Sequence, residues 1–271
     1  MRFESRRKRR QRELDELVFE PSWRIMLTAR WPHWQRLSDA ERSRLEDLTK
    51  AFVAEKRWEA AHGFELTEAM QVLIAAQACL LVLELDGDPF RGVTTILVHP
   101  TTLVLVGQRS TGTGGLVSSD PYPILGQAQF GGPTIVAWDA VSYDARHPWR
   151  GQNVVYHEFA HKLDMLDGLL DGTPPLVDDA MRRRWVEVFT REFNALRRGL
   201  PGNLLRDYGA ENPGEFFAVA TEYYFSKPVE MRAQKPDLYA ALSGFYRQDP
   251  AARFPTVALA AEDPMSGTAA S

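Results

Sequence analysis

The sequence has little of what several classes of protein require. Its 271 residues include a single cysteine, Cys79, so no internal disulfide can form. This fits a reducing compartment or a fold that is stable without covalent cross-links. The most apolar segment, residues 67–85, is interrupted by Gln71, Gln77 and Glu84 and is too short to span a bilayer comfortably. No apolar run follows the basic residues near the start, so a signal peptide is not expected. These absences predict a cytoplasmic protein without a membrane span.

The chain also has no excess of positive charge, since its net charge is −4. Residues 1–12 hold seven Arg or Lys and one Glu, a local charge of +6, which leaves −10 for the rest of the chain. This acidic body argues against nucleic acid as a direct partner. We interpret the basic run at residues 6–10 as part of a flexible tail over residues 1–21. Contact of this run with phosphates or with a membrane surface is the alternative.

The composition, 44% hydrophobic and 25% charged, is that of a globular protein. It predicts a single domain over residues 22–253, with a flexible tail at 254–271. The first part of this domain, residues 22–90, is expected to be helical. Apolar side chains recur every three or four residues over 23–57, which predicts packing helices, and residues 67–85 are predicted to form a buried helix.

The second part, residues 91–253, is expected to form the catalytic core. Residues 93–98 and 103–106 are short β-branched runs that predict two strands, and residues 133–138 predict a third, whose leading proline suits a sheet edge. Such an edge would pair with an extended peptide. The alternative is an edge covered by residues 108–132, which show no periodicity and predict a long loop. The predicted fold class is therefore α+β, with a small mixed sheet behind packing helices.

The motif HEFAH at residues 157–161 is the main functional signal. Histidines four residues apart on a helix project toward one point, so His157 and His161 would give zinc two nitrogen ligands. Glu158 would lie a quarter-turn away, where its carboxylate reaches a water molecule on the metal without occupying the coordination site. Asn153 suits the start of this helix and Gly168 its end. The alternative is a core helix whose two histidines make ordinary hydrogen bonds.

Zinc needs a third protein ligand, and two residues compete for this role. Asp167 stands six residues after His161, where some zinc proteases place their last ligand after a glycine turn. Here the turn position is Asp164 instead of glycine, so the chain is expected to stay helical and to point Asp167 away. Glu215 is the other candidate, near the start of a helix predicted over residues 212–226.

The spacing of Glu215 also fits a capping box, in which its carboxylate would only close the helix start. Glu222 follows seven residues later on the same helix, which is otherwise rich in aromatic residues. Buried carboxylates need partners, and a metal and a ligand histidine would supply them. We favour Glu215 as the third ligand, with Glu222 or Asp164 hydrogen-bonded to a ligand histidine.

These residues carry a resemblance to a known family. Six stretches are similar to the Mlc titration factor A family of zinc metallopeptidases: GFEL at 63–66, LEL at 83–85, GPTIVAW at 132–138, HEFAHKLD at 157–164, NPGEFFAVATEYYFS at 212–226 and FYRQDP at 245–250. The resemblance covers roughly residues 22–253. It implies a gluzincin-type fold like the catalytic domain of anthrax lethal factor, with Glu215 as the third ligand and Tyr208 as a residue that stabilises the transition state. It also implies a partner, a glucose-responsive repressor of the Mlc type.

Two classes of function follow. In the first, the protein carries one zinc ion per chain on His157, His161 and Glu215, and hydrolyses peptides or proteins with Glu158 as general base. An aminopeptidase is one version of this hypothesis. In the second, it sequesters a transcriptional repressor and has little or no catalysis. The intact Glu158 favours the peptidase, because a pure binding protein has no use for a general base.

Overall fold

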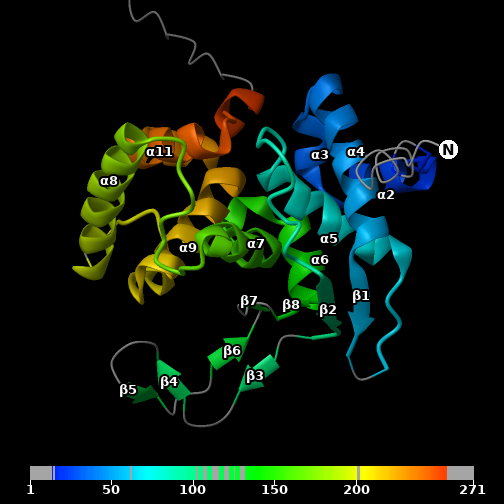
Figure 1. Ribbon diagram of the computed structural model, residues 1–271, viewed down its shortest axis with the longest axis horizontal. Coiled ribbons are helices and arrows are strands. Elements are labelled where there is room, and N and C mark those ends of the chain that lie inside the picture. Colours follow the sequence, from blue (N-terminus) through cyan, green and yellow to red (C-terminus); the bar gives the residue numbers. More distant parts are fainter. Residues whose placement is uncertain are drawn as a thin grey trace, which may run out of the picture.

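The computed structural model describes Leu14, residues 16–61, 63–101, 132–199 and 202–254, and short strands between residues 103 and 128. The basic run at residues 6–10 and the tail beyond residue 254 lie outside these ranges. Figure 1 shows helix α7 in the middle of the molecule, between α8, α9 and α11 on one side and α2 to α5 on the other. None of the described helices combines the length and the apolar character that a membrane crossing requires.

The first third of the chain forms the predicted packing helices. They are α2 (Pro21–Arg30), α3 (Pro32–Arg36), α4 (Asp39–Glu55) and α5 (Glu68–Leu81). Helix α4 begins with a capping box: Ser38 Oγ accepts a hydrogen bond from Glu41 N, and Glu41 Oε2 accepts one from Ser38 N. Helix α5 is the predicted buried helix, and Cys79 is buried on it.

The folded chain begins earlier than the predicted boundary at residue 22. Phe19 is 7% exposed and packs edge-to-face on Trp23, with ring centroids 5.2 Å apart. It also stacks on Trp34 at 6.1 Å. A buried aromatic ring removes a large apolar area from water, so residues near Phe19 belong to the core and not to the tail.

A mixed sheet of four strands lies under the central helix, as the sequence predicts. Its order is β1 (Arg57–Ala60), β2 (Thr95–His99), β8 (Thr134–Ala137) and β7 (Gly126–Ala128). The first three strands are parallel, and β7 is antiparallel to β8. Strand β1 falls in the segment predicted as helix. Two further pairs complete the described strands: β3 (Leu103–Leu105) with β6 (Tyr122–Ile124), and β4 (Arg109–Thr111) with β5 (Leu116–Ser118).

The prediction that residues 133–138 form an edge strand is wrong. Strand β8 has a neighbour on each side, because residues 126–128 of the segment predicted as a loop pair with it as β7. The alternative, a loop of residues 108–132 that covers this edge, holds only in part, because residues 126–128 cover β8 as a paired strand and make β8 an inner strand. Pro133 does not conflict with this position, since it precedes the first paired residue, Thr134, and its missing N–H interrupts no ladder.

The remaining helices are the central helix α7 and the helices that pack around it and the sheet. They are α6 (Trp138–Arg146), α7 (Val154–Asp164), α8 (Asp179–Arg197), α9 (Pro213–Ser226), α10 (Pro228–Gln234) and α11 (Pro236–Tyr246). Short 3-10 turns lie at η1 (Pro148–Arg150), η2 (Met165–Asp167), η3 (Asp207–Ala210) and η4 (Pro250–Arg253). Almost every residue of α7 and α9 is buried, so these two helices hold their polar side chains in the interior. One hydrophobic core contains side chains from residues 22–90 and from residues 91–253, so the two parts pack as one unit.

Candidate metal centre

The start of helix α7 is fixed by three side chains. Asn153 is its N-cap, and Asn153 Oδ1 accepts a hydrogen bond from Tyr156 N at 2.9 Å. The backbone N–H of Asn153 donates to Glu222 at 2.7 Å, and that of Val154 donates to Asp144 at 3.1 Å. Buried N–H groups at a helix start need such acceptors, and carboxylates there also interact favourably with the helix dipole.

Helix α7 presents His157 and His161 on one side, one turn apart. The two rings lie 4.8 Å apart and almost perpendicular, and the two Nε2 atoms are 3.2 Å from each other. Both imidazoles are buried, at 8% and 6% exposure. Two nitrogen lone pairs at this separation converge on one point, as the four-residue spacing predicts.

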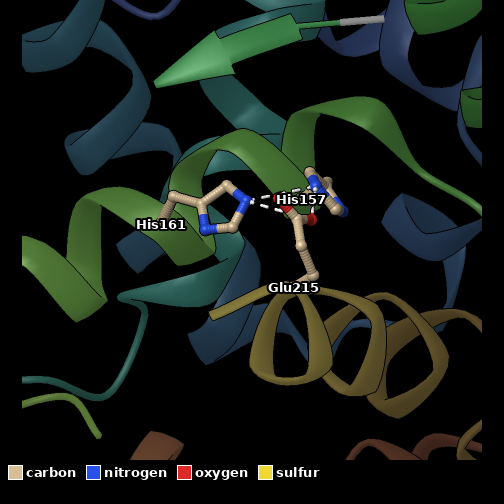
Figure 2. Close-up of side chains that lie close together, drawn as sticks. All are labelled: His157, His161 and Glu215. Atoms are coloured by element: carbon tan, nitrogen blue, oxygen red, sulfur yellow. Dashed lines mark hydrogen bonds and ion pairs between the residues drawn. The ribbon is translucent and has the colours of Figure 1, made fainter. Parts of the chain in front are cut away.

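Helix α9 supplies the third group. Asn212 caps it by accepting a hydrogen bond from Glu215 N at 3.0 Å, and Pro213 occupies the first turn. The Glu215 carboxylate meets the histidines: Oε2 lies 3.0 Å from Nε2 of His157 and 3.5 Å from Nε2 of His161. Figure 2 shows this side chain rising from α9 toward the two rings. One ligand atom from each of the three residues lies within 4.8 Å of the others.

This donor set fits a metal cation. Glu215 Oε2 is buried and has no hydrogen-bond donor in the described part of the chain, although it faces two imidazole nitrogens. Burial opposes a charged imidazolium at His157, but the adjacent carboxylates of Glu215 and Glu222 outweigh it and raise the pKa of His157 to about 10. The carboxylates therefore favour positive charge at this point. Two nitrogens and one oxygen are also the donors of a catalytic metal site with an open position.

Asp167, the competing ligand, lies apart from this cluster. It ends the 3-10 turn after α7, is exposed, and accepts a hydrogen bond from Leu169 N at 3.1 Å. Gly168 then adopts a left-handed conformation, with φ of 94°, and turns the chain away. The structure thus brings Glu215, and not Asp167, to the two histidines.

Glu222 takes the supporting position beside His157. Its Oε1 lies 2.8 Å from Nδ1 of His157 and accepts the Nδ1 proton, so Nε2 is the nitrogen of this ring that faces the cluster. Asp164, the other candidate for this role, accepts a hydrogen bond from Gly172 N at 2.8 Å. Among the described residues, Nδ1 of His161 has no hydrogen-bond partner. Asp164 therefore holds the loop after α7 instead of a ligand ring.

A pocket of about 400 Å³ opens beside His157 and Glu158. Burial raises the pKa of Glu158 to about 8, and its Oε2 has no hydrogen-bond donor within the described residues. A proton acceptor with free lone pairs, buried next to a pocket, suits a general base. The lining residues are Asp139, Ala140, Tyr143, Asp144, Arg150, Gln152, Val154, His157, Glu158, Arg206, Tyr208 and Glu222.

Tyr208 reaches this pocket from the 3-10 turn η3. Its ring lies 5.8 Å from that of His157, tilted by 34°. The sequence predicts this placement only through the family resemblance. Three other lining residues, Arg206, Asp144 and Arg150, have no signal in the sequence, because arginine and aspartate are common on any surface and nothing local marks these as buried or as facing a pocket.

These features place the molecule in a class. An HExxH helix that meets a glutamate from a second helix, next to a pocket and a small mixed sheet, is the arrangement of a metallopeptidase-type protein. The chain belongs to the glucose-regulated metallo-peptidase M90 family, whose model matches residues 5–247. The resemblance to the Mlc titration factor A family is thereby confirmed.

Individual relatives show the same likeness over most of the chain. An uncharacterized protein of Synechocystis is 36% identical over 245 residues, 89% of each chain. The Mlc titration factor A of Yersinia pestis is 33% identical over 227 residues, covering 80% of this chain and 81% of the relative. That of Yersinia pseudotuberculosis matches with the same identity and extent. The family match over residues 5–247 contains helices α2 to α11 and the three groups of the candidate metal centre.

Proposed function

We propose that this protein is a zinc-dependent peptidase of the gluzincin type, with one zinc ion per chain bound by His157, His161 and Glu215. The convergence of these three groups beside the carboxylate of Glu158, whose Oε2 has no hydrogen-bond partner among the described residues, is the observation that carries the proposal. The family supports a metal and a peptidase reaction. The donor set supports zinc, which takes two histidines and one glutamate with an open position in catalytic sites of this kind.

The residues of the chain have separate tasks in this reaction. Zinc, when bound, supplies Lewis-acid chemistry that acidifies water and polarises a carbonyl. Glu158 accepts the proton of the water molecule that attacks the peptide carbonyl, and then passes it to the leaving amine. Tyr208 donates a hydrogen bond to the oxyanion that develops on the carbonyl oxygen. Glu222 keeps the ring of His157 in the required tautomer and orientation.

The substrate is a peptide or protein whose scissile bond lies in the pocket beside Glu158. We further propose an aminopeptidase form of this activity. Amino-acid anilides with a free α-amine should then be cleaved, and N-acetylated peptides of the same sequence should not. We also propose that the folded chain, residues 22–253 together with the ring of Phe19, acts as one domain in the cytoplasm.

A second function is favoured by the relatives that carry the name Mlc titration factor A. This name supports binding of a repressor of the Mlc type, either beside peptidase activity or in its place. Binding and hydrolysis make different demands on Glu158, because its carboxylate is only 2% exposed and offers a partner little surface.

The variant Glu158→Gln tests the peptidase directly. It keeps the size of the side chain but removes the basic carboxylate, so zinc should stay bound while hydrolysis falls by roughly 10²–10⁴-fold. Zinc content is measured by metal analysis, and turnover on anilides and peptides is measured with and without a chelator. Hydrolysis at the parent rate would show that Glu158 is not the base. Repressor binding that survives in this variant would separate the second function from the first.

A further inference from the structure

Arg206 is a polar residue of the pocket that has no role in the proposed reaction. Its side chain is 22% exposed and reaches Glu222, which is 2% exposed. Arg206 Nη1 donates to Glu222 Oε2 at 2.9 Å, and Nη2 donates to Oε1. This two-pronged contact matches the planar guanidinium to the planar carboxylate and restricts both side chains to one geometry. The carboxylate that it grips is the same one that orients His157.

Arg206 also belongs to the segment that carries Tyr208. It is the N-cap of the turn η3, and its carbonyl accepts a hydrogen bond from Gly209 N at 3.1 Å. Its guanidinium lies 5.7 Å from the centre of the Tyr208 ring. The side chain of Arg206 therefore contacts Glu222, the carboxylate that orients His157. Its backbone caps the turn that carries Tyr208.

The other end of this turn is held by packing. A Cβ atom on Gly209 would lie 3.2 Å from Leu196 and 3.3 Å from Val219, so the backbone there fits closely between α8 and α9. Packing holds this end of the turn against the two helices. The ion pair of Arg206 with Glu222 attaches the other end of the turn to α9 with a defined direction, two residues before Tyr208.

We propose that Arg206 is a positioning residue, which couples Tyr208 to the metal centre through its ion pair with Glu222. The inference rests on the proposed function, because it concerns a residue of the same site. A simpler role would be to neutralise the buried charge of Glu222. The two roles differ in what a lysine can do: lysine supplies the charge but not the planar pair of donors.

The experiment compares Arg206→Lys, Tyr208→Phe and the double variant with the parent protein. Arg253→Lys is the matched control, because Arg253 also donates two nitrogens to a carboxylate, Nε at 3.0 Å and Nη2 at 2.8 Å from Glu41 Oε1, and its side chain is only 11% exposed. Three quantities are measured: zinc content, kcat and KM of the zinc-loaded proteins on a cleaved peptide, and hydrogen exchange of backbone amides in the zinc-free proteins.

Tyr208→Phe should lower kcat by roughly 10²-fold with little change in KM, as expected for a donor used only in the transition state. Arg206→Lys should retain zinc and lower kcat by about tenfold or more. The double variant should be no slower than Tyr208→Phe alone, because Arg206 acts through Tyr208. In the zinc-free protein, the amides of Gly209 and Glu211 should exchange about tenfold faster in Arg206→Lys and at the parent rate in the control.

The outcomes separate this proposal from the proposed function. Parent-like kcat in Tyr208→Phe would remove Tyr208 from the mechanism, and with it the coupling. If Tyr208→Phe lowers kcat but Arg206→Lys does not, Tyr208 keeps its role and the proposed role of Arg206 is overturned. The role of Arg206 is also overturned if the fold-losses in kcat of the two single variants multiply in the double variant. If Arg206→Lys does not fold, the pair R206Q/E222Q leaves no uncompensated buried charge. If the amides of Gly209 and Glu211 exchange at the parent rate in this double variant, the proposal is overturned as well.

Discussion

Gly172→Ala is expected to damage both the stability of the protein and its metal centre, although this residue touches no ligand. Gly172 follows α7 and lies against the start of α9, with φ of 76°. A Cβ atom there would lie 2.3 Å from the carbonyl oxygen of Pro213 and 2.8 Å from its carbonyl carbon. Both are backbone atoms that no rotamer change can move, and Pro213 is the first residue of the helix that carries Glu215.

Two contributions set the loss in the free energy of unfolding of Gly172→Ala. A left-handed conformation costs an alanine roughly 1–2 kcal/mol. Forcing a methyl group into a closely packed site adds roughly 1–3 kcal/mol, because backbone has to shift. The loop itself resists such a shift: Gly172 N donates to Asp164 at 2.8 Å, and Trp185 Nε1 donates to the Gly172 carbonyl at 2.9 Å. The sum is a loss of about 2–5 kcal/mol in the free energy of unfolding.

Gly87→Ala is the matched control. Gly87 has nearly the same conformation, with φ of 79°, but an added Cβ would meet no atom within 4 Å. It should therefore cost only the conformational term, about 1–2 kcal/mol. Denaturant unfolding of the zinc-free proteins measures both losses. Chelator competition should show weaker zinc binding in Gly172→Ala only, by about tenfold or more, as expected when ligand orientation is disturbed. Equal losses in the two variants, with equal zinc affinity, would refute the reasoning.

Two further predictions concern carboxylates. Glu215→Ala should lose most of its zinc affinity while Asp167→Ala should keep it, since Glu215 and not Asp167 lies at the histidines. Metal analysis measures the zinc content of both variants, and the reverse result would make Asp167 the third ligand. Burial raises the pKa of Asp144 to about 7, so the folded protein holds a proton that the unfolded chain releases near pH 4. Stability should therefore fall as the pH rises from about 4 to 7, and Asp144→Asn, which still accepts from Val154 N, should reduce this fall by roughly 1–3 kcal/mol. Denaturant unfolding at pH 5 and pH 8 measures the difference, and an unchanged pH dependence would show that Asp144 is not protonated in the folded state.

Those features of the site that depend on neighbours in the chain could be predicted from the sequence. His157 and His161 share a helix face because of their spacing, and Asn153 opens that helix through its own side chain. The helix of Glu215 likewise begins at its predicted cap. For such features the deciding interactions span three or four residues, so a local pattern contains them.

Tertiary structure alone decided the rest. Strand β1 has no β-branched residue in Arg57–Ala60 and becomes a strand by pairing with β2, and β8 is an inner strand because β7 pairs with it. Glu215 could have closed a capping box, and the choice between Glu222 and Asp164 as the partner of a ligand histidine was open. The packing of α9 against α7 resolved both questions, because it brings side chains more than fifty residues apart into contact, and no local pattern of the sequence records such a distance.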